Sequence, residues 1–265
     1  MRGGDMMKMS YSNQFYLDRE YVNYSALSDE AFLAYVAIRF FMTRKPILYI
    51  SLEHLCYIIA FSRNKLGRNG KFYKADPQLK NKLKKGIEEL DKLSIIKVKQ
   101  RLSQNAFVIN VEQIYINTSK EMVEYEFGAE SDEDTDEDNP DDNIKVFKQF
   151  TMVGLDEVQK IMNLEENVSR IKLLRYFIVM ISTINYNTKV GWTSIKKMSE
   201  QASISNKTAI EFNKLLRKHE IIYFEKGALR HSKADGTFRR DCNTYSRWDD
   251  QEQCRERARS HYTNR

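Results

Sequence analysis

The sequence predicts an α+β protein, mainly helical, in which two similar domains flank an acidic linker. The 265-residue chain is 42% hydrophobic and 12% aromatic, enough to bury two small cores. The same order of helices and strands recurs in each half. Between the halves, residues 130–142 (ESDEDTDEDNPDD) contain nine acidic residues and no basic one. This composition is typical of a solvated, disordered linker.

The first half predicts a helix, a short strand, two helices and a β-hairpin. Ser28, Ser51 and Asp76 precede the three helices and can cap them, and Pro77 suits the first helical position. The apolar positions of the third helix recur every three or four residues, at Leu79, Leu83, Ile87, Leu90 and Leu93. In chain order, the predicted elements cover residues 31–42, 47–50, 52–61, 77–93, 94–99 and 106–111, with a turn at 100–105.

The second half repeats this order after the acidic run. Ser205 can cap its third helix. The predicted helices cover residues 164–185, 193–202 and 206–219, and the predicted strands cover 189–192, 221–225 and 243–247, with a long basic loop over 227–241.

This succession of elements is the order of a winged helix, in which the third helix enters the DNA major groove and the hairpin forms a wing. Its recurrence on both sides of a linker is harder to obtain by accident than a single occurrence. We therefore predict tandem winged helix-turn-helix domains over residues 13–120 and 146–250. An acidic flexible linker over 121–145 joins them, and a basic tail over 251–265 follows.

The charge of the chain favours a polyanionic partner. The formal net charge is +6, but residues 126–142 hold ten acidic residues and no basic ones. The rest of the chain has 43 basic and 27 acidic residues, a net charge of +16. A strongly basic surface of this kind is typical of nucleic-acid binding, although basic composition also serves solubility alone.

The third helix of the second domain carries the best candidates for DNA contact. Asn206 and Lys207 lie at its N-terminal end, where base contacts usually fall, and an apolar Ile210 on the same face could touch a thymine methyl group or a protein partner. A cationic face is also common on ordinary solvated helices, but the basic wing favours DNA. The candidate residues are Asn206, Lys207, Ile210, Lys214, Arg217 and Lys218 on the helix, and Arg230, Lys233, Arg239 and Arg240 in the wing.

The first domain offers a weaker set of candidates. Its third helix is rich in lysine, and its hairpin contributes one arginine. The domain either binds DNA or pairs with a second copy to form a homodimer. The candidate DNA-binding residues are Lys80, Asn81, Lys84, Lys85 and Arg101.

Sequence motifs for other functions were not found. GRNGK (67–71) is too short for a phosphate-binding loop, and no closely spaced histidine pair could hold a metal. We therefore expect no enzymatic activity, catalytic residue, cofactor or metal. The three cysteines lack a disulfide pattern, and no apolar run is long enough to span a membrane. These features predict a cytoplasmic protein without a membrane partner.

The segment FYLDREYVNYSALSDEAFLAYVAIRF resembles the N-terminal region of replication initiators from plasmids and phages of Gram-positive bacteria. The shared features are an aromatic-rich start (Phe15-Tyr16, Tyr21-Val22), a Leu27-Ser28 helix start followed by Ala31 and Tyr35, and a strand at Leu93-Ser94-Ile95-Ile96. The resemblance covers roughly residues 13–115. It implies binding to repeated origin sites and recruitment of host replication proteins.

Taken with the residues, the resemblance predicts a sequence-specific double-stranded DNA-binding protein that initiates replication. A transcriptional regulator with the same folds is one alternative, and a helicase-loader or primosome adaptor whose winged helices bind proteins is another. The acidic linker serves as a spacer, or it mimics DNA by folding onto a basic face and competing with non-specific DNA.

Overall fold

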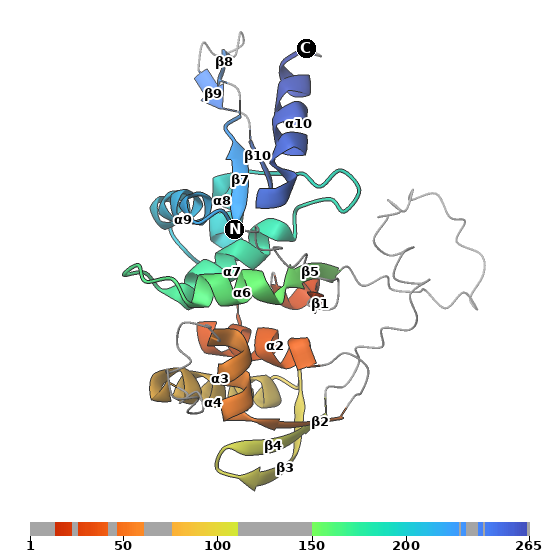
Figure 1. The fold of residues 1–265 in the computed structure, drawn as a ribbon, viewed down its shortest axis with the longest axis vertical. Coiled ribbons are helices and arrows are strands. Elements are labelled where there is room, and N and C mark those ends of the chain that lie inside the picture. Colours follow the sequence, from red (N-terminus) through yellow and green to blue (C-terminus); the bar gives the residue numbers. More distant parts are fainter. Residues whose placement is uncertain are drawn as a thin grey trace, which may run out of the picture. The chain divides into compact units, whose positions relative to one another are not determined.

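The computed structural model describes residues 14–22, 26–41, 47–60, 76–110, 150–227, 229–231, 238–240 and 242–263. These residues form an α+β protein with small antiparallel sheets (Figure 1). They divide into two compact units. Unit 1 contains the described residues within 1–17, 26–112 and 152–175, and unit 2 contains those within 18–25, 113–151 and 176–265. The predicted linker, residues 121–145, lies outside the described residues.

Unit 1 contains a three-stranded antiparallel sheet and a group of helices. Its elements are β1 (Gln14–Asp18), α2 (Asp29–Phe41), β2 (Ile47–Ser51), α3 (Leu52–Ala60), α4 (Pro77–Lys92), β3 (Lys97–Ser103), β4 (Ala106–Asn110), β5 (Phe150–Gly154), α6 (Leu155–Met162) and the first half of α7 (Arg170–Ile181). In the sheet, β4 lies between β2 and β3 and pairs antiparallel with both. Strands β1 and β5 pair in a separate two-stranded sheet.

Helix α2 forms the centre of unit 1. Every side chain from Ala31 to Arg39 is buried, and α4 packs along this helix. Gly86 of α4 permits the close approach, because a Cβ atom at this position would lie 2.1 Å from the backbone oxygen of Glu30. The spacing between the two helices therefore depends on a residue without a side chain.

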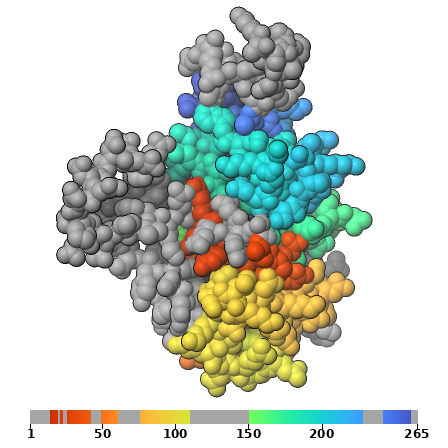
Figure 2. All heavy atoms as spheres, turned by 180° about the vertical axis from the view of Figure 1, so that it is seen from behind, coloured from red at the N-terminus to blue at the C-terminus, as the bar shows by residue number. Residues whose placement is uncertain are grey.

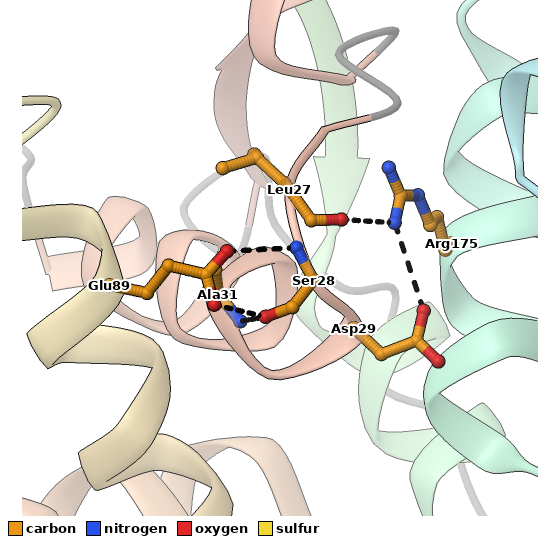
Figure 3. Close-up of polar contacts among 6 residues, drawn as sticks. All are labelled: Leu27, Ser28, Asp29, Ala31, Glu89 and Arg175. Atoms are coloured by element: carbon orange, nitrogen blue, oxygen red, sulfur yellow. Dashed lines mark hydrogen bonds and ion pairs between the residues drawn. The ribbon is translucent and has the colours of Figure 1, made fainter. Parts of the chain in front are cut away.

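The N-terminus of α2 is held from two sides (Figure 3). Ser28 caps the helix, since its Oγ accepts a hydrogen bond of 3.0 Å from the backbone N–H of Ala31. Glu89 of α4 accepts two bonds from Ser28, at 3.0 Å from the backbone N–H and 2.5 Å from Oγ. On the other side, Arg175 of α7 donates a 2.8 Å bond to the Leu27 carbonyl and lies 3.7 Å from the Asp29 carboxylate.

Arg175 is a buried cation and also lies over the ring of Phe32. Burial lowers its pKa from the ordinary value of arginine, and the charge of Asp29 opposes that shift. A guanidinium remains charged at neutral pH even after such a shift. The contact therefore joins α7 to α2 within unit 1 by a charge-assisted bond.

Unit 2 contains a second three-stranded antiparallel sheet and a group of helices. Its elements are α1 (Arg19–Val22), the second half of α7, β6 (Gly191–Thr193), α8 (Ile195–Gln201), α9 (Asn206–Lys218), β7 (Ile222–Glu225), β8 (Leu229–His231), β9 (Phe238–Arg240), β10 (Asn243–Arg247), the 3-10 helix η3 (Trp248–Asp250) and α10 (Gln251–Thr263). Strand β10 lies between β6 and β7 and pairs antiparallel with both. In both three-stranded sheets, the last strand in the chain is thus the central one.

Several predicted helix starts are confirmed. Backbone N–H groups donate to the capping side chains of Ser28, Ser51, Asp76 and Ser205, as the sequence predicted. The three strands 47–50, 106–111 and 243–247 also match β2, β4 and β10 closely. No helix among the described residues combines the length and apolar character needed to cross a bilayer.

The prediction of one helix over residues 164–185 was wrong. The helix in this region, α7, covers only Arg170–Ile181. At its end, the hydroxyls of Ser182 and Thr183 donate to the carbonyls of Val179 and Met180, and the side chain of Asn185 accepts two backbone bonds in a turn. Short polar side chains compete in this way with the helical bonding pattern.

The two hairpins also differ from the prediction. The strand predicted over 94–99, which the resemblance placed at 93–96, begins only at Lys97, because residues 93–96 form a turn in which Ser94 has a φ of 57°. Strand β3 continues to Ser103, so the turn is shorter than the predicted 100–105. Leu93, expected on the apolar side of its helix, is 42% exposed at the C-cap. The predicted loop 227–241 contains β8 and β9, which pair antiparallel. The segment 251–263, expected as a tail, forms α10 because Cys254 and Ala258 pack one helical turn apart against the sheet.

Candidate nucleic-acid interface

Helix α9 is the helix predicted as the third of the second domain, and it begins directly after a tight turn from α8. Ser203 in this turn has a φ of 55°, and Ser205 caps α9 by accepting a 3.1 Å bond from the Thr208 N–H. The cap fixes where the helix begins. Its first turn therefore presents Asn206 and Lys207, both exposed, as the sequence predicted.

The inward face of α9 is fixed by a buried hydrogen bond. Asn213 accepts a 3.0 Å bond from the hydroxyl of Tyr176, whose ring also contacts Phe212. Burial raises the pKa of Tyr176 far above the ordinary value of tyrosine, so the hydroxyl stays protonated and remains a donor. A buried polar pair of this kind holds the helix in one rotational setting about its axis.

The outward face of α9 is cationic. Lys207, Lys214 and Lys218 are exposed there, Ile210 is 44% exposed between them, and Glu211 is the one acidic residue of the helix. Figure 2 shows the cyan to light-blue segment that contains α9 at the surface of unit 2. An exposed row of lysines around a small apolar side chain can contact phosphates and a base edge at the same time.

Among the predicted α9 residues, Asn206 and Arg217 contact groups within unit 2. The side chain of Asn206 accepts a 2.5 Å bond from the hydroxyl of Ser199 on α8, which ties the start of α9 to that helix. The guanidinium of Arg217 lies 5.0 Å from the ring centroid of Tyr223 and 5.1 Å from that of Phe224. Both residues remain on the exposed side of the helix.

The segment predicted as a basic wing is described in part. Strands β8 and β9 place Arg230 opposite Arg239 and Leu229 opposite Arg240 in an antiparallel pair. Lys233 lies outside the described residues, as do the side chains of the three arginines. The backbone therefore brings three cationic positions onto one short hairpin between β7 and β10.

In unit 1, the predicted DNA-binding residues differ in exposure, and some of them form ion pairs. Asn81 and Lys85 of α4 are exposed and Lys84 is half-buried, but Lys80 forms an ion pair with Glu53 that lowers the pKa of this glutamate. The Arg101 guanidinium lies 3.4 Å from the Glu88 carboxylate and over the Phe107 ring. Two of the predicted cations of unit 1, Lys80 and Arg101, thus have acidic partners.

The structure describes all three cysteines, of which Cys56 and Cys254 are buried and Cys242 is exposed. Within the described ranges, no group of three or more His, Cys, Asp or Glu residues could hold a metal ion. Burial raises the pKa of Cys56 to about 12 and that of Cys254 to about 11, so both thiols are protonated at neutral pH.

The sequence did not reveal which residues orient α9. Asn213 was missed, although an amide in the same apolar row as Ala209 and Leu216 is a signal for a buried hydrogen bond. Tyr223 and the helix that covers it were missed as well. Comparison of the chain with protein-family models, curated proteins and solved structures found no match.

Proposed function

We propose that the chain is a sequence-specific double-stranded DNA-binding protein with two winged-helix units, and that it initiates replication of a plasmid or phage. The observation that carries the DNA-binding proposal is the exposed cationic face of α9, with Lys207, Lys214 and Lys218 on a helix whose opposite face is fixed. The winged-helix assignment is supported by the order of elements and by the central position of the last strand in both sheets.

In this proposal, α9 enters the major groove. Asn206 and Lys207 reach base edges from its first turn, and Ile210 contacts a thymine methyl group. Lys214 and Lys218, further along the helix, contact phosphates of the flanking backbone. The β8–β9 hairpin binds phosphates beside a neighbouring groove, and no step requires a cofactor or a catalytic residue.

Unit 1 supplies either a second DNA-binding helix or the dimer contact. Asn81 and Lys85 of α4 are exposed and support DNA contact, whereas the ion pairs of Lys80 and Arg101 reduce the charge available for it. A homodimer would place two copies of α9 on a repeated or palindromic site, which is the arrangement that repeated origin sites require. Sedimentation of the full chain with and without DNA distinguishes the two roles.

DNA binding is tested by titrating the full chain with duplex DNA at several salt concentrations. We expect the logarithm of the binding constant to fall linearly with the logarithm of salt concentration, with a slope of roughly −0.9 for each phosphate contact. An affinity that hardly changes between low and moderate salt would contradict the proposal. That result would favour an adaptor that binds proteins.

The biological role is tested by footprinting on the DNA that surrounds the coding gene. A replication initiator protects repeated sites in a replication origin and recruits host replication proteins there. A transcriptional regulator with the same folds protects promoters instead. Protection confined to promoters would therefore replace the initiator by the regulator while leaving the DNA-binding proposal intact.

A further inference from the structure

Tyr223 of β7 lies against guanidinium groups from two different helices. Its side chain is 4% exposed. Arg217 of α9 and Arg255 of α10 each place the guanidinium carbon 5.0 Å from the centroid of its ring. A guanidinium over an aromatic face is attracted by the negative charge of the ring, so this tyrosine connects α9 to α10.

The hydroxyl group of Tyr223 fixes the orientation of the ring. It accepts a 3.0 Å hydrogen bond from Nε of Arg255 and donates a bond to the carboxylate of Glu225 in the same strand. Arg255 is held in turn by Gln251 one helical turn earlier, whose side-chain oxygen accepts a 3.1 Å bond. The hydrogen bond to Tyr223 raises the pKa of Arg255, so its guanidinium is positively charged at neutral pH.

Beside its buried apolar row, helix α9 has side-chain contacts with the rest of unit 2 at its start, its middle and its end. Asn206 is bonded to Ser199 at the start, and Asn213 is bonded to Tyr176 in the middle. At the end, Arg217 packs on Tyr223 and Phe224. The third attachment differs from the other two because α10 contributes to it through Arg255.

We propose that Arg255 is a positioning residue for the DNA-binding helix, acting on Arg217 and the end of α9 through Tyr223. Figure 1 shows α10 alongside β7 and β10, the strands on which it packs. Losing Arg255 removes the bond that orients the tyrosine hydroxyl and one of the two groups stacked on its ring. The Tyr223 ring on which Arg217 packs then becomes more mobile. The last turn of α9, which carries Lys214 and Lys218, is no longer held in one orientation.

The inference is tested by DNA affinity and by hydrogen exchange of α9. The affinity measurement rests on the proposed DNA binding, whereas the exchange measurement does not. The alternative role for Arg255 is direct phosphate contact. A lysine at position 255 could serve in that role but could not serve as a positioning residue. Lysine keeps a point charge that can bind a phosphate, but it lacks the planar group that stacks on Tyr223 and donates in a fixed direction. A positioning arginine is therefore not rescued by lysine.

The experiment compares Arg255→Met and Arg255→Lys in the full chain with Arg257→Met as the matched control. Arg257 is on the same helix, and its guanidinium carbon lies 4.9 Å from the ring centroid of Trp192 on the edge strand β6. Affinity for a duplex fragment flanking the coding gene is measured across a salt series. Hydrogen exchange of α9 amides is measured in the free protein.

We expect both Arg255 variants to bind the duplex roughly three- to tenfold more weakly with an unchanged salt slope, and the control to change affinity less than about twofold. In the free protein, amides in the second half of α9 should exchange faster in both Arg255 variants than in the control. Rescue by lysine, together with a salt slope shallower by about one for methionine, would identify a phosphate contact and overturn the proposal.

Equal exchange of α9 amides in the Arg255 and Arg257 variants would also overturn it, because the coupling through Tyr223 would then be absent. The exchange measurement needs no DNA. If the unmodified chain fails to bind duplex DNA, the proposed function is wrong, and the exchange data still decide whether α10 positions α9.

Discussion

Replacing Lys207 with alanine is expected to reduce binding to the specific site roughly tenfold or more, and to reduce non-specific binding much less. The reason is that Lys207 lies in the first turn of α9, where side chains reach base edges. Fluorescence anisotropy with a specific and a scrambled duplex measures both affinities. Lys196→Ala on α8, another exposed lysine, is the control, and equal losses on both duplexes for Lys207→Ala would mean that it contacts backbone only.

At the same scale, Glu89 should matter far more for stability than its neighbour Glu88. Glu89→Ala removes both hydrogen bonds to Ser28 at the start of α2, and we expect a loss of about 1–3 kcal/mol in the free energy of unfolding. Glu88→Ala breaks an exposed ion pair with Arg101 and should cost less than about 1 kcal/mol. Urea unfolding measures both, and similar losses would show that the Ser28 contact is energetically unimportant.

Single residues were predictable from the sequence where their role is local. Ser28, Asp76 and Ser205 cap helices that begin within three residues of them, so the neighbouring sequence contains the whole signal. Asn213 and Arg175 were not predictable, because their partners are 37 and 148 residues away. Only the packing of distant segments brings these groups together.

At the scale of elements, Gly86→Ala is expected to destabilise unit 1 although alanine favours helices. Alanine improves helix propensity by about 1 kcal/mol, but its Cβ would lie 2.1 Å from the Glu30 carbonyl oxygen, and separating α2 from α4 costs about 1–3 kcal/mol or more. We therefore expect a lower melting temperature. Lys85→Ala, at an exposed neighbouring position, should leave it nearly unchanged, and a stabilised Gly86→Ala would contradict the close approach.

The wing should contribute affinity without sequence preference. Replacing Arg239 and Arg240 of β9 together by alanine removes two cations, so binding to all duplexes should weaken and the salt slope should become shallower by up to about two. The same salt titration with specific and scrambled duplexes measures this. Unchanged affinity on both would exclude the hairpin from the interface.

Whole elements were predicted well where apolar periodicity and a cap coincide, as in α4 and α9. The ends of α7 were predicted poorly because Ser182, Thr183 and Asn185 form side-chain bonds that end a helix without changing its apolar pattern. Helix α10 was missed because ten of its thirteen residues are charged or polar, and Cys254 and Ala258 are the buried apolar residues among its described side chains. Two small buried residues give too weak a periodic signal.

At the scale of the whole molecule, the acidic run 130–142 gives the remaining prediction. If the run competes with DNA for the basic surfaces, its deletion should raise non-specific affinity more than specific affinity, because the competing negative charge is gone. If it is only a spacer, non-specific affinity should stay unchanged. Binding of the intact and shortened chains to a scrambled duplex at low salt distinguishes the two roles.

Helix α9 has one buried row of residues and one exposed row, and the angle between them about the helix axis is fixed by the helical repeat. Ala209, Phe212 and Leu216 are committed to the interior, and the exposed positions follow from them at 100° per residue. One residue inserted after Lys207 would turn that lysine away from the outward face. In the proposed DNA-binding role, divergent copies of this protein should therefore acquire new target sequences by substitution at positions 206, 207 and 210, while the length of the segment from Ser205 to His219 stays constant.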